Sequence, residues 1–174
     1  MSKVFDHLIR EIPDFPKPGI VFKDITPLIA DKDAFSQCCN EIAHYAADCD
    51  YIAGIEARGF IFASAACVLT GKGFIPIRKS GKLPGQTISQ SYDLEYGQAT
   101  LEIHSGLIKE GKRVLVVDDV LATGGTAIAA VQLLKEAGLV PTGLVFLLEI
   151  SQLGARSRIA EVLPGIQTHT ILAE

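Results

Sequence analysis

Two adjacent aspartates and a nearby loop of glycines and threonines are the residues of this sequence best suited to bind a ligand. In the segment VLVVDDVLATGGTA, residues 114–127, an apolar run ends in Asp118 and Asp119. The loop that follows opens a helix-period segment, and its residues are Ala122, Thr123, Gly124, Gly125 and Thr126. Glycines let backbone N–H groups turn toward one point, and a helix N-terminus favours negative charge. The loop is therefore predicted to bind a phosphate group.

The acids beside this loop restrict the kind of phosphate compound that fits. The loop is not a Walker loop, because no Gly-Lys-Ser/Thr follows it, and it lacks the GxGxxG of dinucleotide sites. Two carboxylates next to a phosphate repel it unless they accept hydrogen bonds from hydroxyl groups or hold a cation. A phosphorylated sugar meets both needs, with its vicinal diol on Asp118 and Asp119. The structural alternative is a helix cap beside one partly buried aspartate.

Two basic segments could hold a further anionic group. Arg58, in the segment EARG, offers a planar fork for a phosphate, and the neighbouring amides of Glu56 and Ala57 offer more donors. The alternative is a surface arginine paired with Glu56. A second cluster of three positive charges favours a diphosphate clamp over a solvated basic face, and it consists of Arg78, Lys79 and Lys82.

The elements that must position these residues follow an α/β pattern. Short runs rich in Val and Ile alternate with helix-period segments, which predicts a mostly parallel sheet with helices on both faces. Strands are expected at residues 51–55, 74–77, 114–117, 142–148 and 168–172, and helices at residues 4–12, 33–47, 58–69, 125–137 and 153–162. Ligands bind such sheets at the carboxyl edge of the strands. This edge would bring the EARG segment beside the phosphate loop.

Two regions interrupt the pattern. Residues 15–28, FPKPGIVFKDITPL, lie in a proline-rich part of the chain where a long helix is impossible. Residues 78–104 are polar, contain three glycines and end in the alternating TLEIH, which predicts a protruding antiparallel hairpin. An insertion of this length is more often a functional lid than a plain connector.

Composition sets the remaining limits. With 174 residues, 48% hydrophobic, the chain is expected to form a single domain, residues 1–174. A net charge of −4 argues against nucleic-acid or membrane binding, and residues 59–70, the longest uncharged apolar run, are too short to span a bilayer. The four cysteines show no zinc-ligand spacing and are interpreted as reduced structural thiols of a cytoplasmic protein, with a catalytic cysteine as the unsupported alternative. The four histidines show no shared spacing or triad pattern and are interpreted as structural or surface residues, so no metal site is expected.

The phosphate loop with its paired acids resembles the 5-phosphoribosyl-1-diphosphate (PRPP) motif of type I phosphoribosyltransferases. Four further segments resemble the adenine-specific branch of that family: DFPKPGIVFKDITPL (14–28), DYIAGIEARGF (50–60), IRKSGKLPG (77–85) and SYDLEYGQATLE (91–102). With LLEISQLGARSRI (147–159) they span nearly the whole chain. The resemblance implies transfer of the phosphoribosyl group from PRPP to adenine, which gives AMP and diphosphate in purine salvage.

The same resemblance implies roles for individual residues. Adenine would stack on Phe22 in an N-terminal hood, residues 1–30, while backbone groups of Val21 and Lys23 read its edge. Glu95 would exchange a proton with the base inside the lid, residues 78–104, to which Tyr96 also belongs. Mg²⁺ would be held mainly through PRPP and diphosphate oxygens. A homodimer is also expected, and the apolar segment 60–62 could supply part of its interface.

Three other functions agree less well with the sequence. A salvage transferase for hypoxanthine, guanine, xanthine or uracil is disfavoured by the FPKPGIVFKDITPL segment. A PRPP-sensing regulator would usually carry a nucleic-acid-binding domain or a basic face. The 174 residues leave no room for the first, the net charge of −4 disfavours the second, and the sequence keeps Arg58, Lys82 and Glu95. A receiver-type signalling domain also pairs acids at a strand end, but it needs neither the phosphate loop nor a lid.

Overall fold

A computed structural model describes residues 5–93 and 97–172 of the chain. Its larger sheet has seven strands in the order β5-β6-β4-β3-β7-β8-β9. The neighbouring pairs β4–β3, β3–β7, β7–β8 and β8–β9 are parallel, whereas β5–β6 and β6–β4 are antiparallel. The strands of this sheet are β3 (Tyr51–Ile55), β4 (Gly73–Lys79), β5 (Thr87–Asp93), β6 (Gln98–His104), β7 (Arg113–Leu121), β8 (Val140–Glu149) and β9 (Gln167–Leu172).

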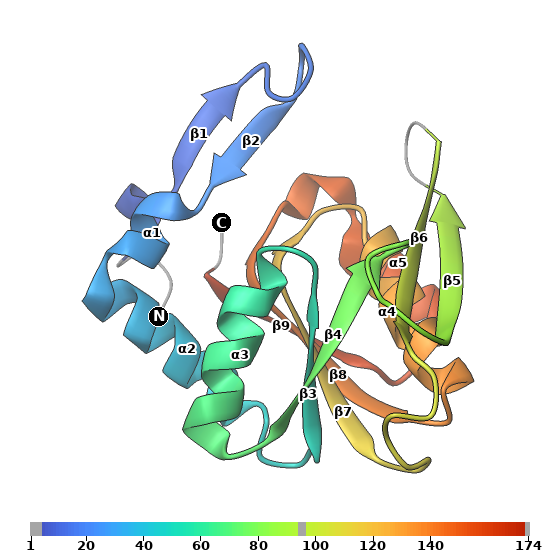
Figure 1. The fold of residues 1–174 in the computed structure, drawn as a ribbon. Coiled ribbons are helices and arrows are strands. Elements are labelled where there is room, and N and C mark those ends of the chain that lie inside the picture. Colours follow the sequence, from blue (N-terminus) through green and yellow to red (C-terminus); the bar gives the residue numbers. More distant parts are fainter. Residues whose placement is uncertain (1–4, 94–96, 173–174) are drawn as a thin grey trace.

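Helices cover both faces of this sheet, as the alternating pattern predicts (Figure 1). Strand β7 is buried on both sides, with Leu115 and Val117 facing one apolar core and Val114 and Val116 the other. The first core is completed by α2 (Lys32–His44) and α3 (Gly59–Thr70), the second by α4 (Gly125–Glu136) and α5 (Ala155–Val162). None of the helices in residues 5–93 and 97–172 is both long and apolar enough to cross a membrane.

The N-terminal segment forms a separate two-stranded hairpin of β1 (Arg10–Pro13) and β2 (Val21–Asp24), followed by the short helix α1 (Thr26–Ala30). The expected helix over residues 4–12 is therefore wrong, since Asp6–Leu8 form a 3₁₀ turn and the next residues form β1. Apolar spacing alone favoured a helix, but backbone pairing with β2 stabilises the extended form. The expectation that residues 15–28 contain no long helix is confirmed.

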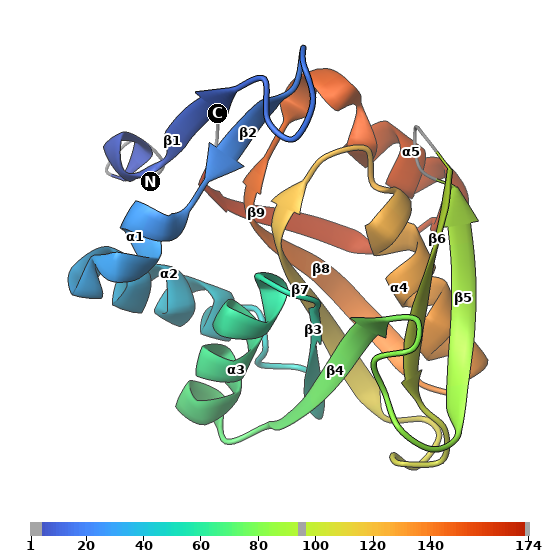
Figure 2. The ribbon, with the colours of Figure 1, turned by 45° about the horizontal axis from the view of Figure 1, so that its top comes forward.

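The expected hairpin within residues 78–104 is confirmed as β5 and β6, which pair from Thr87–His104 to Asp93–Gln98. It is not a detached projection, because β6 also pairs with the end of β4 through Arg78–Glu102 and Lys79–Leu101. Strand β5 lies against α4 (Figures 1 and 2). Both hairpins, β1–β2 and β5–β6, extend toward the upper end of the molecule as drawn in the two views. The hairpin β5–β6 forms one edge of the seven-stranded sheet, whereas β1–β2 is a sheet of its own.

Candidate functional site

The loop from Ala122 to Thr126 joins the carboxyl end of β7 to the N-terminus of α4. Gly124 has a φ of +81°, a left-handed conformation that favours glycine. No side chain caps α4, and the first-turn N–H groups of a helix have no partners within it. A small pocket of about 70 Å³ opens here, lined among others by Asp118, Thr123 and Thr126. The loop thus presents uncapped backbone donors and two hydroxyl groups to one small space.

Asp118 and Asp119 lie within β7, which continues to Leu121 and so extends beyond the expected end at residue 117, and the two acids have different surroundings. Asp119 is 6% exposed, whereas Asp118 keeps partial exposure and its Oδ1 accepts a hydrogen bond from the Asp119 N–H at 2.9 Å. Burial of the Asp118 carboxyl group, with the negative charge of Asp119 beside it, raises the pKa of Asp118 well above its usual value. A ligand that brings hydroxyl donors or a cation to this carboxyl group would favour its ionised form.

Arg58 reaches from the EARG segment to the second aspartate. Its Nε lies 2.6 Å from Asp119 Oδ2, an ion pair. The N–H group is not aligned with this oxygen, however, and Asp119 Oδ2 is the buried side-chain atom of the described residues that lacks a hydrogen bond. Arg58 Nη1 also donates to the Lys23 carbonyl at 3.2 Å, and the guanidinium carbon lies 4.8 Å from the centre of the Phe22 ring. One side chain therefore connects the acid pair to the hood.

The EARG segment and the acid pair are direct neighbours, as the sheet-edge argument predicts. Strands β3 and β7 pair in parallel, so their carboxyl ends meet. A Cβ atom added to Gly59 would lie 2.7 Å from Asp118 Oδ1 and 2.9 Å from the Val117 carbonyl oxygen. Only glycine permits this approach without displacement of β7. The Glu56–Ala57 peptide bond at the start of the segment is cis.

Glu56 is not the partner of Arg58, which answers the structural alternative for that arginine. It pairs instead with Arg78, whose Nε and Nη2 each donate to a Glu56 oxygen at 3.1 Å. Arg78 also donates to the Lys82 carbonyl at 2.9 Å, and the Lys79 N–H donates to Glu56 at 3.1 Å. Arg78 therefore neutralises Glu56 and fixes the backbone of the basic segment. The Glu56 pKa is lowered chiefly by its hydrogen bond with Arg78.

The side chains of Lys79 and Lys82 remain exposed at the surface of this segment. Their loop is held from below by Glu102, a buried acid that accepts hydrogen bonds from the Lys82 and Leu83 N–H groups at 2.9 Å each. The sequence reasoning missed Glu102, because an acid within an alternating strand gives no sign that its side chain is buried. Arg78 and Lys79 thus end β4 and Lys82 lies in the turn that follows, so two ammonium groups are available to an anion.

Phe22 is half-buried in β2, between Phe15 of the hood, at 5.2 Å between ring centres, and the Arg58 guanidinium. The hood is held together by Asp24, which accepts hydrogen bonds from Arg10 of β1 and from the N–H and hydroxyl groups of Thr26. These hydrogen bonds, those of Thr26 foremost, lower the pKa of Asp24 to about 2. An aspartate two residues before a threonine at a helix start is a turn signal that could have identified this residue.

Tyr92 of β5 joins the site from the hairpin, and the sequence reasoning gave it no role. Its hydroxyl group lies 3.3 Å from Thr126 Oγ1 in the phosphate loop. Arg158 of α5 approaches the same loop, with Nη1 3.5 Å from the Thr123 carbonyl oxygen. Glu95 and Tyr96 lie outside the described residues, so their predicted roles rest on the sequence.

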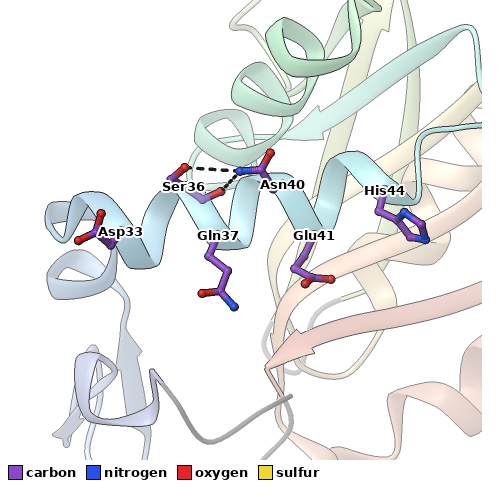
Figure 3. A pocket seen from close by; sticks show the side chains of 6 residues that line it. All are labelled: Asp33, Ser36, Gln37, Asn40, Glu41 and His44. Atoms are coloured by element: carbon purple, nitrogen blue, oxygen red, sulfur yellow. Dashed lines mark hydrogen bonds between the residues drawn. The ribbon is translucent and has the colours of Figure 1, made fainter.

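A hollow elsewhere on the molecule contains none of the predicted site residues. It lies along the exposed face of α2 and has a volume of about 640 Å³. Figure 3 shows Asn40 bonded to the Ser36 carbonyl and hydroxyl groups on this face. The other side chains that line it are Asp33, Gln37, Glu41 and His44 (Figure 3). This face is an open polar helix surface, so the site at the sheet edge is the candidate that carries chemistry.

Comparison with known proteins identifies the family to which the chain belongs. Residues 24–157 match the phosphoribosyl transferase domain, and the chain belongs to the phosphoribosyltransferase family. Its relatives are more specific. It is 50% identical over 164 residues to adenine phosphoribosyltransferase of Thermobifida fusca, which covers 93% of each chain.

Two solved structures agree with this placement. Adenine phosphoribosyltransferase of Thermoanaerobacter pseudethanolicus superposes with a TM-score of 0.90, at 43% identity and 98% coverage of both chains. The Saccharomyces cerevisiae enzyme, crystallised with an imino-altritol bisphosphate and adenine, gives a TM-score of 0.88 at 32% identity, covering 97% of this chain and 96% of the other. The predicted fold class and family are confirmed.

Proposed function

We propose that this chain catalyses the reaction of adenine with PRPP to give AMP and diphosphate, the adenine phosphoribosyltransferase step of purine salvage. The observation that carries the proposal is Arg58, which contacts both Asp119 beside the phosphate loop and Phe22 in the hood. A ribose bound to the acids and a flat base on the phenylalanine would therefore meet at one arginine. The names of the relatives at about 50% identity support the same activity.

The 5-phosphate of PRPP is assigned to the loop Ala122–Thr126. The uncapped N-terminus of α4 and the hydroxyl groups of Thr123 and Thr126 support this assignment. A phosphate held there would fix one end of the substrate. The ribose diol would then lie on Asp118 and Asp119, and donation to Asp119 Oδ2 would give a buried oxygen the hydrogen bond that it lacks.

The diphosphate group is assigned to the basic side of the site. Arg58, Lys79 and Lys82 supply charge, and backbone amides of Glu56 and Ala57 supply donors. Arg78 contributes indirectly, because its pairing with Glu56 removes a negative charge that would repel the diphosphate. As the bond from the anomeric carbon to the diphosphate oxygen breaks, these groups stabilise the charge on the leaving group.

Adenine is assigned to the hood. Strand β2 pairs with β1 on one edge only, and the Lys23 carbonyl on the opposite edge accepts from Arg58. Successive residues of a strand direct their backbone groups to opposite edges, so Val21 shares the edge of Lys23. This edge can read the donors and acceptors of a base that stacks on Phe22. A base nitrogen would attack the anomeric carbon with inversion, and the proton that adenine loses is assigned to Glu95.

The residues present also fit a magnesium ion bound together with PRPP. Mg²⁺ typically binds through one or two carboxylates plus substrate phosphates and waters. Asp118 and Asp119 offer two carboxylates, and the described residues hold no cluster of three acidic, histidine or cysteine ligands that would bind the ion alone. The ion would supply Lewis-acid stabilisation of the diphosphate.

Assembly and boundaries belong to the proposal as well. We assign residues 1–174 to one catalytic domain with the hood at 1–30 and the lid at 78–104, in a cytoplasmic homodimer. An exposed apolar face of α3, formed by Ile61, Val68 and Leu69, supports the dimer. Phe62, named in the expected interface segment, is fully buried in the core and cannot contribute.

The activity is tested by offering adenine, hypoxanthine, guanine and uracil in parallel with PRPP and Mg²⁺. Formation of AMP from adenine alone is expected. Turnover of another base would agree with the assigned PRPP site but contradict the assignment of the hood to adenine. Binding of PRPP without any turnover would overturn the transferase activity and favour a regulator.

A further inference from the structure

Strand β5 brings an aromatic hydroxyl group to the phosphate loop from an element 34 residues away in sequence. Tyr92 OH lies 3.3 Å from Thr126 Oγ1. Its ring packs against the apolar core beneath α4 and is half-buried. Alternate residues of the strand, Ile88, Gln90 and Tyr92, are likewise half-buried, so one face of β5 lies against α4. The tyrosine is therefore held in place by packing and presents only its hydroxyl group to the loop.

The hairpin β5–β6 also packs beside Gly125 of the loop. A Cβ atom built on Gly125 would lie 3.5 Å from the Asp93 carbonyl oxygen and 3.7 Å from Tyr92 Cδ2. Arg158 Nη1 would lie 3.8 Å from the same point. The N-terminus of α4 is therefore enclosed by the hairpin on one side and by α5 on another. The position of β5 thus contributes to the shape of the phosphate loop.

We propose that Tyr92 is a positioning residue for the 5-phosphate and acts through Thr126. A hydroxyl group has one proton to donate and lone pairs that accept. Without a ligand, Thr126 donates to Tyr92. With a phosphate in the loop, Thr126 donates to the phosphate and accepts the proton of Tyr92. The second hydrogen bond orients the first and strengthens it.

This inference rests on the proposed function, since it assigns a further residue to the same 5-phosphate site. Its consequence is specific to one part of the substrate. Removal of the Tyr92 hydroxyl group should weaken binding of a phosphate monoester in the loop. It should leave binding of diphosphate at the basic segment unchanged, because Tyr92 contacts no residue of that segment in the described hydrogen bonds.

The test compares Tyr92→Phe with wild type in calorimetric titrations with ribose 5-phosphate and, separately, with diphosphate. The ribose 5-phosphate Kd is expected to rise about two- to tenfold, the range for loss of one hydrogen bond, while the diphosphate Kd stays within twofold. Tyr51→Phe is the matched control, because Tyr51 begins β3 at the amino end of the parallel strands, whereas the loop follows the carboxyl end of β7. It should bind both ligands as wild type does.

A double-mutant cycle distinguishes positioning from a general loss of structure. If Tyr92 acts through Thr126, the variant Tyr92→Phe/Thr126→Val should bind ribose 5-phosphate as weakly as Thr126→Val alone. Additive losses, an unchanged ribose 5-phosphate Kd in Tyr92→Phe, or equal losses for both ligands would each overturn the proposal. The wild-type assay with adenine and PRPP is run alongside. Absence of AMP there rejects the proposed function, whereas AMP formation with an unaffected Tyr92→Phe rejects only this inference.

Discussion

Asp118 is a site residue whose ionisation lowers the stability of the folded protein. Burial of the Asp118 carboxyl group and the negative charge of Asp119 beside it raise the pKa of Asp118. In the folded protein it therefore binds a proton at pH values at which the unfolded chain has released it. Stability consequently falls as pH rises from about 4 through the folded pKa. Ionised Asp118 is favoured only when a ligand supplies donors or a cation.

Asp118→Asn should accordingly stabilise the free protein at pH 7 and impair catalysis. The amide oxygen can still accept from the Asp119 N–H, while the ionisation penalty is removed. A gain of roughly 1 kcal/mol would raise Tm by about 2–4 °C, and kcat/KM for PRPP should fall at least about tenfold. Thermal melts at pH 7 and pH 3 check the sign, because the gain should disappear at the lower pH. A lower Tm at pH 7 would contradict the argument.

Arg58 is the residue at which the two substrates are expected to meet. Arg58→Lys keeps a positive charge but loses the planar group that lies over Phe22 and bonds to Lys23. The KM values for adenine and for PRPP should both rise, each about tenfold. Lys79→Met serves as the comparison, since its exposed side chain is assigned to diphosphate alone and should change only the KM for PRPP. An Arg58→Lys variant with an unaltered adenine KM would show that Arg58 does not contribute to binding of the base.

At the scale of elements, the two strands of the hood are joined by a small polar cluster, whereas the base of the hood packs into the apolar core through Ile25 and Leu28. Arg10, Asp24 and Thr26 join β1, β2 and the start of α1. Apolar residues of the hood remain exposed, among them Phe15 and Val21. Because β1 is exposed along its whole length and β2 is buried only at Asp24, we expect the geometry of the proposed base site to depend on the charge state of Asp24.

The Asp24 cluster should stabilise the protein in a defined pH range. Its pKa is about 2 in the folded state and 3.8 ordinarily, so its contribution is complete above about pH 4 and is lost as pH falls toward 2. Asp24→Asn should lower the free energy of unfolding in urea at pH 7, and the difference from wild type should shrink at pH 3. Asp48→Asn, at an exposed position, is the control. A difference that persists undiminished at pH 3 would assign the effect to the side chain's shape instead of its charge.

For the whole molecule, the sheet edge collects the phosphate loop, the EARG segment and the basic segment, while two hairpins rise beside them (Figure 1). This arrangement leaves the far side of α3 for assembly. Val68 is 84% exposed and shares that face with Ile61 and Leu69. An apolar helix face of this kind is typical of a subunit interface.

Val68→Asp should therefore yield a monomer. Light scattering after gel filtration should give twice the chain mass of 18.6 kDa for wild type and the single-chain mass for the variant. Leu107→Asp, an exposed leucine on the turn after β6, is the matched control and should keep the wild-type mass. A wild-type protein that elutes as a monomer would remove α3 from the proposed interface.

The sequence by itself determined the strands of the core, the turn from β7 into α4 and the place of the EARG segment. These features follow from local patterns: residues 51–55 were expected as a strand with the bounds that β3 has, and a run such as VLVV is buried on both faces. The helix expected at residues 4–12 failed for the opposite reason. Residues 10–13 form a strand because they pair with β2, which is too far along the chain to enter a local apolar pattern.

Only the tertiary structure decided which side chains meet. Arg58 forms an ion pair with Asp119 and donates a hydrogen bond to the Lys23 carbonyl, Arg78 pairs with Glu56, and the Tyr92 hydroxyl group contacts Thr126. Charge and residue type allow many such pairings, including the pair Glu56–Arg58 that the sequence left open as the structural alternative. Strand register and helix packing fix distances between residues that lie far apart along the chain, and only those distances select among the possible partners.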